Sequence, residues 1–217
     1  MHHVFVTGGT GYLGRSLIPR LLERGHRVGA LVREGSEKKI PSGCRLVTGN
    51  ALDKKSFVKN IAPADTFLQL VGVAHPSPSK EEEFKTIDLA SLCASVAAAT
   101  ESGIKHFVYL SVAQPSSYMK GYVAVREEGE RLVRSSGMDG TFLRPWYVLG
   151  PGHRWPYALV PMYWVLEALP SSREKARRFG LVNLEQMIAA LAGSIENPPE
   201  GIRILEVPEI KRAMFSS

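Results

Sequence analysis

A turn with three spaced glycines constrains the fold of this chain more than any other part of the sequence. Gly8, Gly11 and Gly14 lie between a strand-like apolar run, residues 3–6, and a helical apolar pattern that begins at Tyr12. One glycine permits a sharp bend, one lets the backbone approach a phosphate without an intervening Cβ, and one lets helix and strand pack closely. A tight strand–helix turn with no ligand needs fewer glycines. The pattern therefore predicts that the free N–H groups at the start of the helix bind a dinucleotide pyrophosphate.

The rest of the chain repeats an alternation of strand and helix. Short apolar runs rich in β-branched residues are separated by longer helical patterns, which is typical of a parallel sheet with helices on both faces. We expect strands at residues 3–6, 27–32, 45–48, 66–71, 106–110, 141–143 and 202–207. We expect helices at residues 12–24, 54–60, 87–102, 118–135 and 184–195. The predicted fold class is therefore α/β, a doubly wound parallel sheet.

No linker, repeat or low-complexity tract divides the sequence. We therefore expect one domain over residues 1–217, with a small substrate-side cap over residues 146–180. Residues 142–164 hold all three tryptophans, and these aromatic side chains can line an apolar substrate pocket, form a subunit contact or pack the cap. His75 and His153 lie in predicted loops where either side chain could contact a substrate.

Composition excludes several classes of protein. With 44% hydrophobic and 22% charged residues among 217, the chain can bury a globular core without disulfides. Its longest apolar run, residues 158–166, is far shorter than the roughly 20 residues that cross a bilayer. The first strand begins at once, which leaves no room for a signal peptide. We therefore expect a cytoplasmic protein with no membrane segment.

The charge and the metal-binding residue types limit the partners. A net charge of +6 favours anionic ligands in a general way. The basic residues are scattered apart from a modest cluster at residues 173–178, and no zinc-finger or RNA-recognition motif is present. Cys44 and Cys93 lie far apart, and the six histidines show neither HxxxH nor HExxH spacing. We expect a small-molecule substrate, no nucleic acid and no metal ion, in a monomer or homodimer.

The glycine spacing GxxGxxG, within the letters TGGTGYLG at residues 7–14, resembles the extended and atypical short-chain dehydrogenase/reductase (SDR) family. The resemblance covers most of the chain. It continues in FVYLS at residues 107–111, in TFLRPWYVLGPG at residues 141–152 and in IRILEV at residues 202–207. Within that superfamily, the length and pattern are similar to the NmrA-like branch and to the complex I accessory-subunit-like branch. The resemblance implies an NAD(P)-binding Rossmann fold and an oxidoreductase.

The residue that follows the second strand favours NADP. An Asp or Glu at this place, about 20 residues beyond the glycines, binds the adenosine 2′-hydroxyl of NAD, whereas an Arg meets the 2′-phosphate of NADP. Here the sequence is Val32-Arg33, and a planar guanidinium offers two or more donors to a phosphate. Glu34 could instead pair with Arg33 or bind a ribose, so NAD is the alternative cofactor.

By resemblance, the cofactor also contacts the glycine turn and the ends of further strands. Relatives usually carry an Asp where this chain has Asn50, whose amide keeps an acceptor for the adenine amino group. The implied cofactor residues are Gly8, Thr10, Gly11, Tyr12, Leu13, Gly14, Arg33, Asn50, Ala51, Leu52, Leu70, Val71, Gly72, Pro145 and Val148.

The catalytic residues of the family have partial matches here. In the family a Tyr donates the substrate proton, a Lys four residues later holds the nicotinamide ribose, and a Ser polarises the substrate oxygen. The matching positions are Tyr122, Arg126 and Ser111, so an arginine replaces the lysine. A guanidinium stays charged but cannot relay a proton. The alternative is that Arg126 pairs with Glu130 one turn along the helix and that Tyr122 only packs.

These matches predict hydride transfer from NADPH to a small, hydrophobic carbonyl-type substrate. One alternative is a nucleotide-bound sensor or accessory protein that has given up the catalytic lysine. Another is a flavin- or biliverdin-type reductase that needs no tyrosine as proton donor. Arg126 is the feature that separates the enzyme from the sensor.

Overall fold

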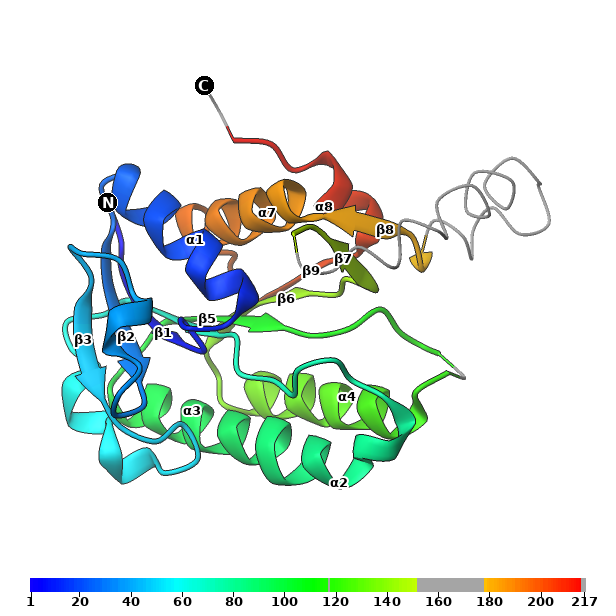
Figure 1. Ribbon diagram of the computed structural model, residues 1–217, viewed down its shortest axis with the longest axis horizontal. Coiled ribbons are helices and arrows are strands. Elements are labelled where there is room, and N and C mark those ends of the chain that lie inside the picture. Colours follow the sequence, from blue (N-terminus) through cyan, green and yellow to red (C-terminus); the bar gives the residue numbers. More distant parts are fainter. Residues whose placement is uncertain (117, 152–177, 216–217) are drawn as a thin grey trace.

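The computed structural model describes residues 1–116, 118–151 and 178–215 (Figure 1). Most of the predicted cap, with His153, lies outside the described residues. Among the helices in these ranges, none is long and apolar enough to cross a membrane.

Seven strands form the central sheet, in the order β3-β2-β1-β4-β5-β6-β9, and every neighbouring pair is parallel. The strands are β1 His3–Thr7, β2 Arg27–Val32, β3 Arg45–Thr48, β4 Thr66–Gln69, β5 His106–Leu110, β6 Asp139–Leu143 and β9 Ile202–Leu205. The strand order reverses between β1 and β4, where the chain leaves the two strands toward opposite faces. The predicted doubly wound sheet is confirmed.

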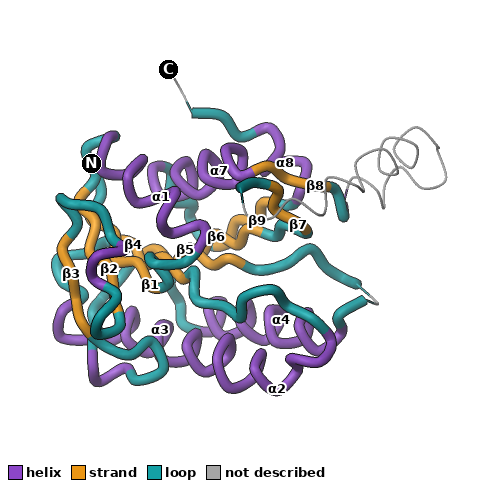
Figure 2. The backbone as a smooth tube through the Cα atoms, in the orientation of Figure 1, coloured by secondary structure: helices purple, strands orange, loops and turns teal. Residues whose placement is uncertain are grey.

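Helices cover both faces of the sheet (Figures 1 and 2). One face carries α1 Tyr12–Glu23, α7 Leu184–Glu196 and α8 Val207–Arg212, and the other carries α3 Ala90–Glu101 and α4 Lys120–Ser135. The connections contain the short helix α2 Glu81–Glu83, a π-helical segment η5 Phe84–Leu89, and the 3-10 turns η1 Glu37–Lys39, η2 Lys54–Ser56, η3 Val58–Asn60 and η4 Pro78–Lys80. Strands β7 Tyr147–Leu149 and β8 Leu181–Asn183 pair with each other outside the main sheet.

Two apolar layers hold the helices to the sheet. Val4 and Val6 of β1 belong to the layer with α1 and α7, whereas Phe5 belongs to the opposite layer, as the alternation of a strand requires. In that second layer Phe67 stacks on Phe107 at 5.2 Å between ring centroids and lies 5.4 Å from Phe5. All five side chains are buried, so the sheet is covered on both faces.

Several predicted elements differ from the structure in their details. The strand expected at 66–71 ends at Gln69, and the helix expected at 87–102 is the π-helical segment η5 followed by α3. The helix expected at 54–60 is two 3-10 turns, because the Ser56 hydroxyl donates to the carbonyls of Asn50 and Asp53 and so competes with helical hydrogen bonding. The strand expected at 202–207 ends at Leu205, since Pro208 has no N–H to donate and suits the first turn of α8. The helix expected at 118–135 begins only at Lys120.

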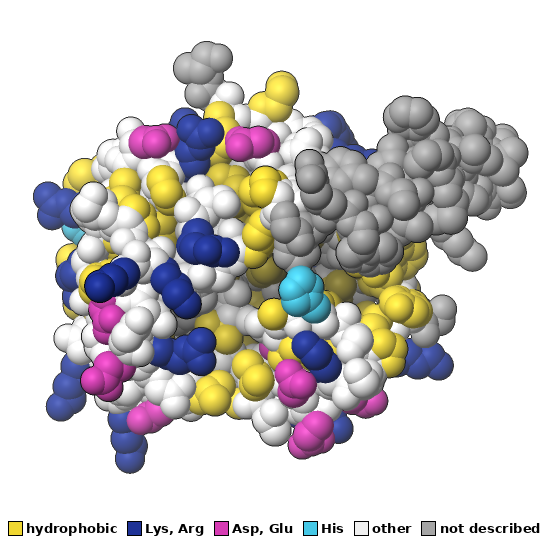
Figure 3. Space-filling model, viewed as in Figure 1, with side chains coloured by type: hydrophobic (Ala, Val, Ile, Leu, Met, Phe, Trp, Pro, Cys, Tyr) yellow, Lys and Arg dark blue, Asp and Glu magenta, His cyan; other side chains and the backbone are white. Residues whose placement is uncertain are grey.

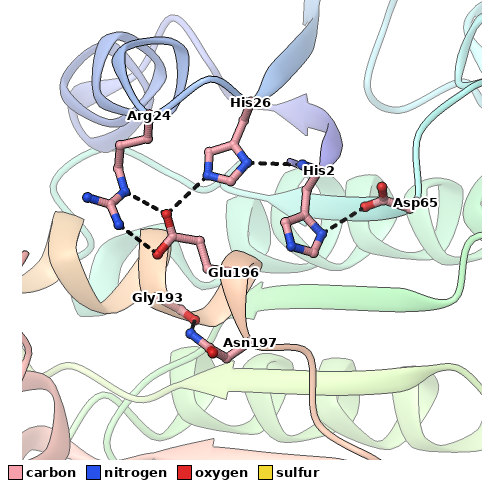
Figure 4. A network of polar contacts seen from close by, with 7 residues as sticks. All are labelled: His2, Arg24, His26, Asp65, Gly193, Glu196 and Asn197. Atoms are coloured by element: carbon pink, nitrogen blue, oxygen red, sulfur yellow. Dashed lines mark hydrogen bonds and ion pairs between the residues drawn. The ribbon is translucent and has the colours of Figure 1, made fainter. Parts of the chain in front are cut away.

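At the amino ends of the strands, a polar network ties α1 to α7 (Figure 4). Arg24 donates to Glu196 from Nε at 2.5 Å and from Nη2 at 3.0 Å, and the His26 ring lies 3.1 Å from the same carboxylate. The hydrogen bond from Arg24 holds the pKa of Glu196 below its ordinary value. The His2 backbone N–H donates to His26 Nδ1 at 3.1 Å. Because His2 and His26 directly precede β1 and β2, this network lies at the opposite end of the sheet from the glycine turn.

Candidate functional site

The glycine turn after β1 is built on close backbone approach. Gly8 has a φ of +78°, and a Cβ there would lie 2.6 Å from the carbonyl carbon of Leu70 and 2.8 Å from the backbone nitrogen of Val71. A Cβ on Gly14 would lie 2.5 Å from Gly9 Cα. The turn is closed by a hydrogen bond from Gly11 N–H to the Gly8 carbonyl at 3.0 Å. A side chain is therefore excluded at Gly8 by both conformation and space, and at Gly14 by space.

The start of α1 offers backbone N–H groups to a ligand. Gly11 caps the helix with no side-chain hydrogen bond, and the first turn contains no acidic residue. Gly11 is exposed, and a Cβ there would meet only the Gly8 carbonyl oxygen, at 3.1 Å. Unsatisfied N–H groups and the positive end of the helix dipole favour an anion. A cradle of glycines beside an uncapped helix start fits the pyrophosphate of a dinucleotide.

The other predicted cofactor residues follow the carboxyl ends of neighbouring strands. Arg33 directly follows β2, Asn50 follows β3, Leu70 follows β4 and Pro145 follows β6. Because the strands are parallel, these ends meet at one edge of the sheet, where α/β folds bind ligands. The fold thus brings the predicted positions to one edge.

Arg33 and Asn50 differ in whether their side chains form hydrogen bonds within the described residues. Arg33 is exposed, and within the described ranges its guanidinium forms no hydrogen bond or ion pair. Asn50 Oδ1 accepts a hydrogen bond from the Leu52 N–H at 3.0 Å. The Asn50 oxygen that was predicted to face adenine therefore already shapes the loop after β3.

Ser111 belongs to a buried network around Glu130. Its hydroxyl donates to Glu130 Oε1 at 2.7 Å, and Gln114 Nε2 donates to the same oxygen at 2.7 Å. Arg144 donates to both oxygens of Glu130, at 2.8 and 2.6 Å, and also to Glu206 at 2.8 Å. A hydroxyl has one hydrogen, so in this arrangement Ser111 is not the donor that polarises a substrate oxygen.

Arg126 does not pair with Glu130, so the alternative of a helical ion pair is wrong. Its Nη2 donates to Asp88 at 2.8 Å, and Nη1 donates to the Leu110 carbonyl at 3.0 Å and to the Tyr109 hydroxyl at 3.4 Å. Both terminal nitrogens are thus engaged inside the protein, where the side chain is 5% exposed. Only the buried Nε has no partner among the described residues. A ribose clamp made by the terminal nitrogens would require these bonds to break.

The charge of Arg126 is strongly maintained. Burial opposes that charge, but the neighbouring Tyr122, Tyr109 and Asp88 outweigh burial and hold the pKa of the guanidinium above its ordinary value. Burial raises the pKa of Tyr109 to about 12, so its phenol stays protonated beside the arginine. The site therefore contains a permanent cation.

Tyr122 lies directly on this cation. The Arg126 guanidinium carbon is 5.0 Å from the centroid of the Tyr122 ring, and the Phe84 ring lies 5.0 Å away on tilted geometry. The ring is half-buried, and its hydroxyl forms no hydrogen bond with the part of the chain that the structure describes. Tyr122 is thus held by its ring while its hydroxyl is uncommitted.

Aromatic side chains gather beside the end of β6. The Trp146 ring lies 6.1 Å from Tyr118, 5.8 Å from Tyr147 and 5.1 Å from Phe179, in each case edge to face. Tyr118 precedes α4 and is 55% exposed. This group of described residues lies after the end of β6, at the same edge of the sheet as the glycine turn.

Sequence reasoning missed two side chains that organise this site, Asp88 and Arg144. Asp88 is the one acidic residue between Glu83 and Glu101 in a stretch expected to pack as an apolar helix. A single carboxylate in such a stretch is the signal that could have found it, since buried charges need partners.

Comparisons with known proteins give the family. Residues 8–157 match the model of the NAD(P)H-binding family, and the chain belongs to that family. NAD(P) binding is what the glycine spacing predicted. The fold is also similar to that of a short-chain dehydrogenase/reductase superfamily protein from Agrobacterium tumefaciens with bound NAD, with a TM-score of 0.69, 18% identity, and coverage of 94% of this chain and 77% of that one.

Individual relatives are distant. The chain is 24% identical to ceramide reductase of Caulobacter vibrioides over 96% of this chain and 65% of that protein. It is 33% identical to the photosystem II assembly factor Ycf39 of Guillardia theta over 53% of this chain and 36% of that protein. The fold is similar to WbmH of Bordetella bronchiseptica in complex with NAD+, with a TM-score of 0.70, 17% identity, and coverage of 95% of this chain and 75% of that one. The chain spans 50% to 65% of the length of the first curated relatives.

Gly8→Ala tests the close approach in the turn. The alanine has to keep the left-handed backbone conformation of Gly8, which costs about 1–2 kcal/mol. Its Cβ also pushes the end of β4 away from the turn. We expect the dissociation constant for NADPH, measured by titration calorimetry, to rise at least about tenfold.

Gly25→Ala is the matched control for this variant. Gly25 has nearly the same φ, +79°, but a Cβ there would have no neighbour within 4 Å. We expect a loss of only about 1–2 kcal/mol in urea unfolding, from the left-handed conformation alone, and unchanged NADPH binding. An equal loss of affinity in the two variants would contradict the role of the close approach.

Proposed function

We propose that this protein is an NADPH-dependent reductase of the atypical SDR type that acts on a small, hydrophobic carbonyl-type substrate. The observation that carries the proposal is the exposed guanidinium of Arg33, which has no partner among the described residues, at the edge that also holds the glycine turn. Binding of an NAD(P) cofactor follows from the family, whereas the choice of NADPH, the reaction and the substrate class are proposals.

The preference for NADPH rests on charge at the end of β2. Val32 is buried and apolar, so no carboxylate stands there to bind a ribose 2′-hydroxyl or repel a 2′-phosphate. Glu34 forms no ion pair with Arg33, which leaves the guanidinium to a phosphate. Lys and Arg side chains are spread over the part of the surface where α1, β2 and β3 lie (Figure 3), which favours the more negative cofactor.

In the proposed reaction Tyr122 is the proton donor. NADPH, when bound, supplies a hydride to the substrate carbon. The Tyr122 hydroxyl donates its proton to the substrate oxygen, so that an alcohol forms, and regains a proton from solvent. Tyr122 suits this step because its hydroxyl is uncommitted and its ring is held over Arg126. We assign Ser111 to the support of Glu130 and Arg126 to the support of Tyr122, in place of the roles implied by the family pattern.

The apolar character of the substrate is inferred from the aromatic group around Trp146. Rings that meet edge to face at a ligand edge present apolar surface with few polar groups. We propose that this group and the predicted cap over residues 146–180 contact the substrate within a single domain. A monomer or homodimer in the cytoplasm is part of the same proposal.

A second candidate is a nucleotide-bound accessory or assembly protein without turnover. It is favoured by the internal bonds that occupy Ser111 and the terminal nitrogens of Arg126. Similarity to a photosystem II assembly factor is in keeping with such a role. Turnover of a carbonyl substrate separates the two candidates.

Arg33→Ala tests the cofactor preference. Loss of the guanidinium removes charge-assisted hydrogen bonds to a 2′-phosphate, which are worth about 1.5–3 kcal/mol. We expect calorimetry to give roughly tenfold or greater weakening of NADPH binding and no change for NADH. Arg27→Ala, an exposed arginine at the other end of β2, is the matched control and should bind NADPH as the wild type does. Equal weakening of both cofactors by Arg33→Ala would rule out recognition of the phosphate.

Tyr122→Phe tests the reaction. In a panel of hydrophobic aldehydes and ketones followed by NADPH absorbance, we expect the variant to lose about 100- to 10,000-fold in rate while NADPH binding is kept. Tyr118→Phe is the control, because it removes the hydroxyl of an exposed tyrosine that precedes α4 and keeps the ring that contacts Trp146. Reduction at the wild-type rate by Tyr122→Phe would remove Tyr122 from the mechanism, and the absence of turnover in the wild type would favour the accessory protein.

A further inference from the structure

One buried carboxylate joins the two halves of the candidate site. Asp88 Oδ1 accepts a hydrogen bond from the Val73 backbone N–H at 2.7 Å, and Oδ2 accepts one from Arg126 Nη2 at 2.8 Å. The Asp88 side chain is 0% exposed. Val73 lies in the segment that follows β4, and Arg126 lies on α4. We call Asp88, Val73 and Arg126 the Asp88 clasp.

The clasp is connected to the glycine turn through residues 70–73. A Cβ on Gly72 would lie 2.7 Å from Arg126 Nη2, so the guanidinium lies against the backbone beside Val73. Two residues earlier, the backbone of Leu70 and Val71 is the surface against which Gly8 packs. A continuous path of contacts therefore runs from the phosphate-binding turn to the ring of Tyr122.

The local helix geometry also singles out Asp88. Asp88 lies in the π-helical segment η5, which precedes the regular helix α3. Such π turns are rare, occur frequently at functional sites, and change the direction of a side chain relative to an α-helix. In η5, the Asp88 carboxylate lies within hydrogen-bond distance of both Val73 and Arg126.

A contribution to folding stability does not by itself account for a buried carboxylate such as Asp88. Burial raises the pKa of Asp88, and Arg126 and the Val73 N–H offset only part of that effect. A buried ion pair commonly gives no more stability than apolar residues of the same size, and its better attested use is to specify one geometry.

We propose that Asp88 is a positioning residue of the nucleotide site. Through the Val73 N–H it holds the segment after β4 against the glycine turn, and through Arg126 it holds the ring of Tyr122. The part that concerns Tyr122 rests on the proposed function, whereas the part that concerns the segment after β4 rests on the fold. Arg126 acts within the clasp as the partner of Asp88.

Asp88→Asn in the full chain tests this proposal. The amide keeps the size of the side chain but loses the negative charge that interacts with the Arg126 guanidinium and the Val73 N–H. At a temperature well below unfolding, we expect backbone amides of residues 70–74 to exchange hydrogen about tenfold faster, by mass spectrometry, and the NADPH dissociation constant to rise about tenfold.

Glu196→Gln is the matched control. Glu196 also bridges two partners, Arg24 and His26, but at the amino ends of the strands (Figure 4). We expect this variant to lose stability in urea unfolding, with NADPH binding and exchange of residues 70–74 unchanged. Equal effects of the two variants on NADPH binding would reduce Asp88 to a general stabilising residue and overturn the proposal.

A second pair of variants keeps the test decisive if Asp88→Asn does not fold. Arg126→Lys retains a cation for Asp88 and should keep most of the NADPH affinity, whereas Arg126→Met should lose it as Asp88→Asn does. Equal NADPH affinity in these two variants would overturn the clasp. If the wild type itself does not bind NADPH, the proposed function fails, while unchanged exchange of residues 70–74 in the Asp88 and Arg126 variants would separately overturn the clasp.

Discussion

The close approach between the turn after β1 and the end of β4 is the constraint on which the site depends. Gly8 meets the backbone of Leu70 and Val71 at a distance that no side chain allows. These two strands are neighbours in the sheet, and the strand order reverses between them. An uncapped helix start, the end of β4 and the end of β2 with Arg33 are thereby brought to one edge. An anionic cofactor fits this edge because backbone N–H groups and an exposed guanidinium lie there together.

Two buried carboxylates organise the other half of the edge. Glu130 holds Arg144, Ser111 and Gln114, and so ties α4 to the ends of β5 and β6. Asp88 holds Arg126 and the segment after β4. Each carboxylate is satisfied by several donors, as buried charges require. Ser111 and Arg126, which stand where the SDR pattern places groups that act on ligands, thus bind these carboxylates inside the protein.

The fold could be predicted largely because its signals are local. Period-two and helical apolar patterns mark β2, β3 and β5 at the bounds that the structure has, and the three glycines mark the turn. The ion pairs could not be predicted in the same way. Arg126 and Glu130 are one helical turn apart and invite pairing, yet Arg126 pairs with Asp88, 38 residues away, and Glu130 with Arg144, 14 residues away. Both side chains lie on the buried face of α4, where the neighbouring elements decide which partner each one meets.

We infer that this edge binds a dinucleotide and prefers NADPH. Calorimetric titration of the unmodified chain with NADPH and with NADH, in parallel and at the same ionic strength, tests it most directly. We predict saturable binding of one NADPH per chain, with NADH bound more weakly. Failure of both cofactors to bind would contradict this inference, because the glycine turn would then serve packing alone.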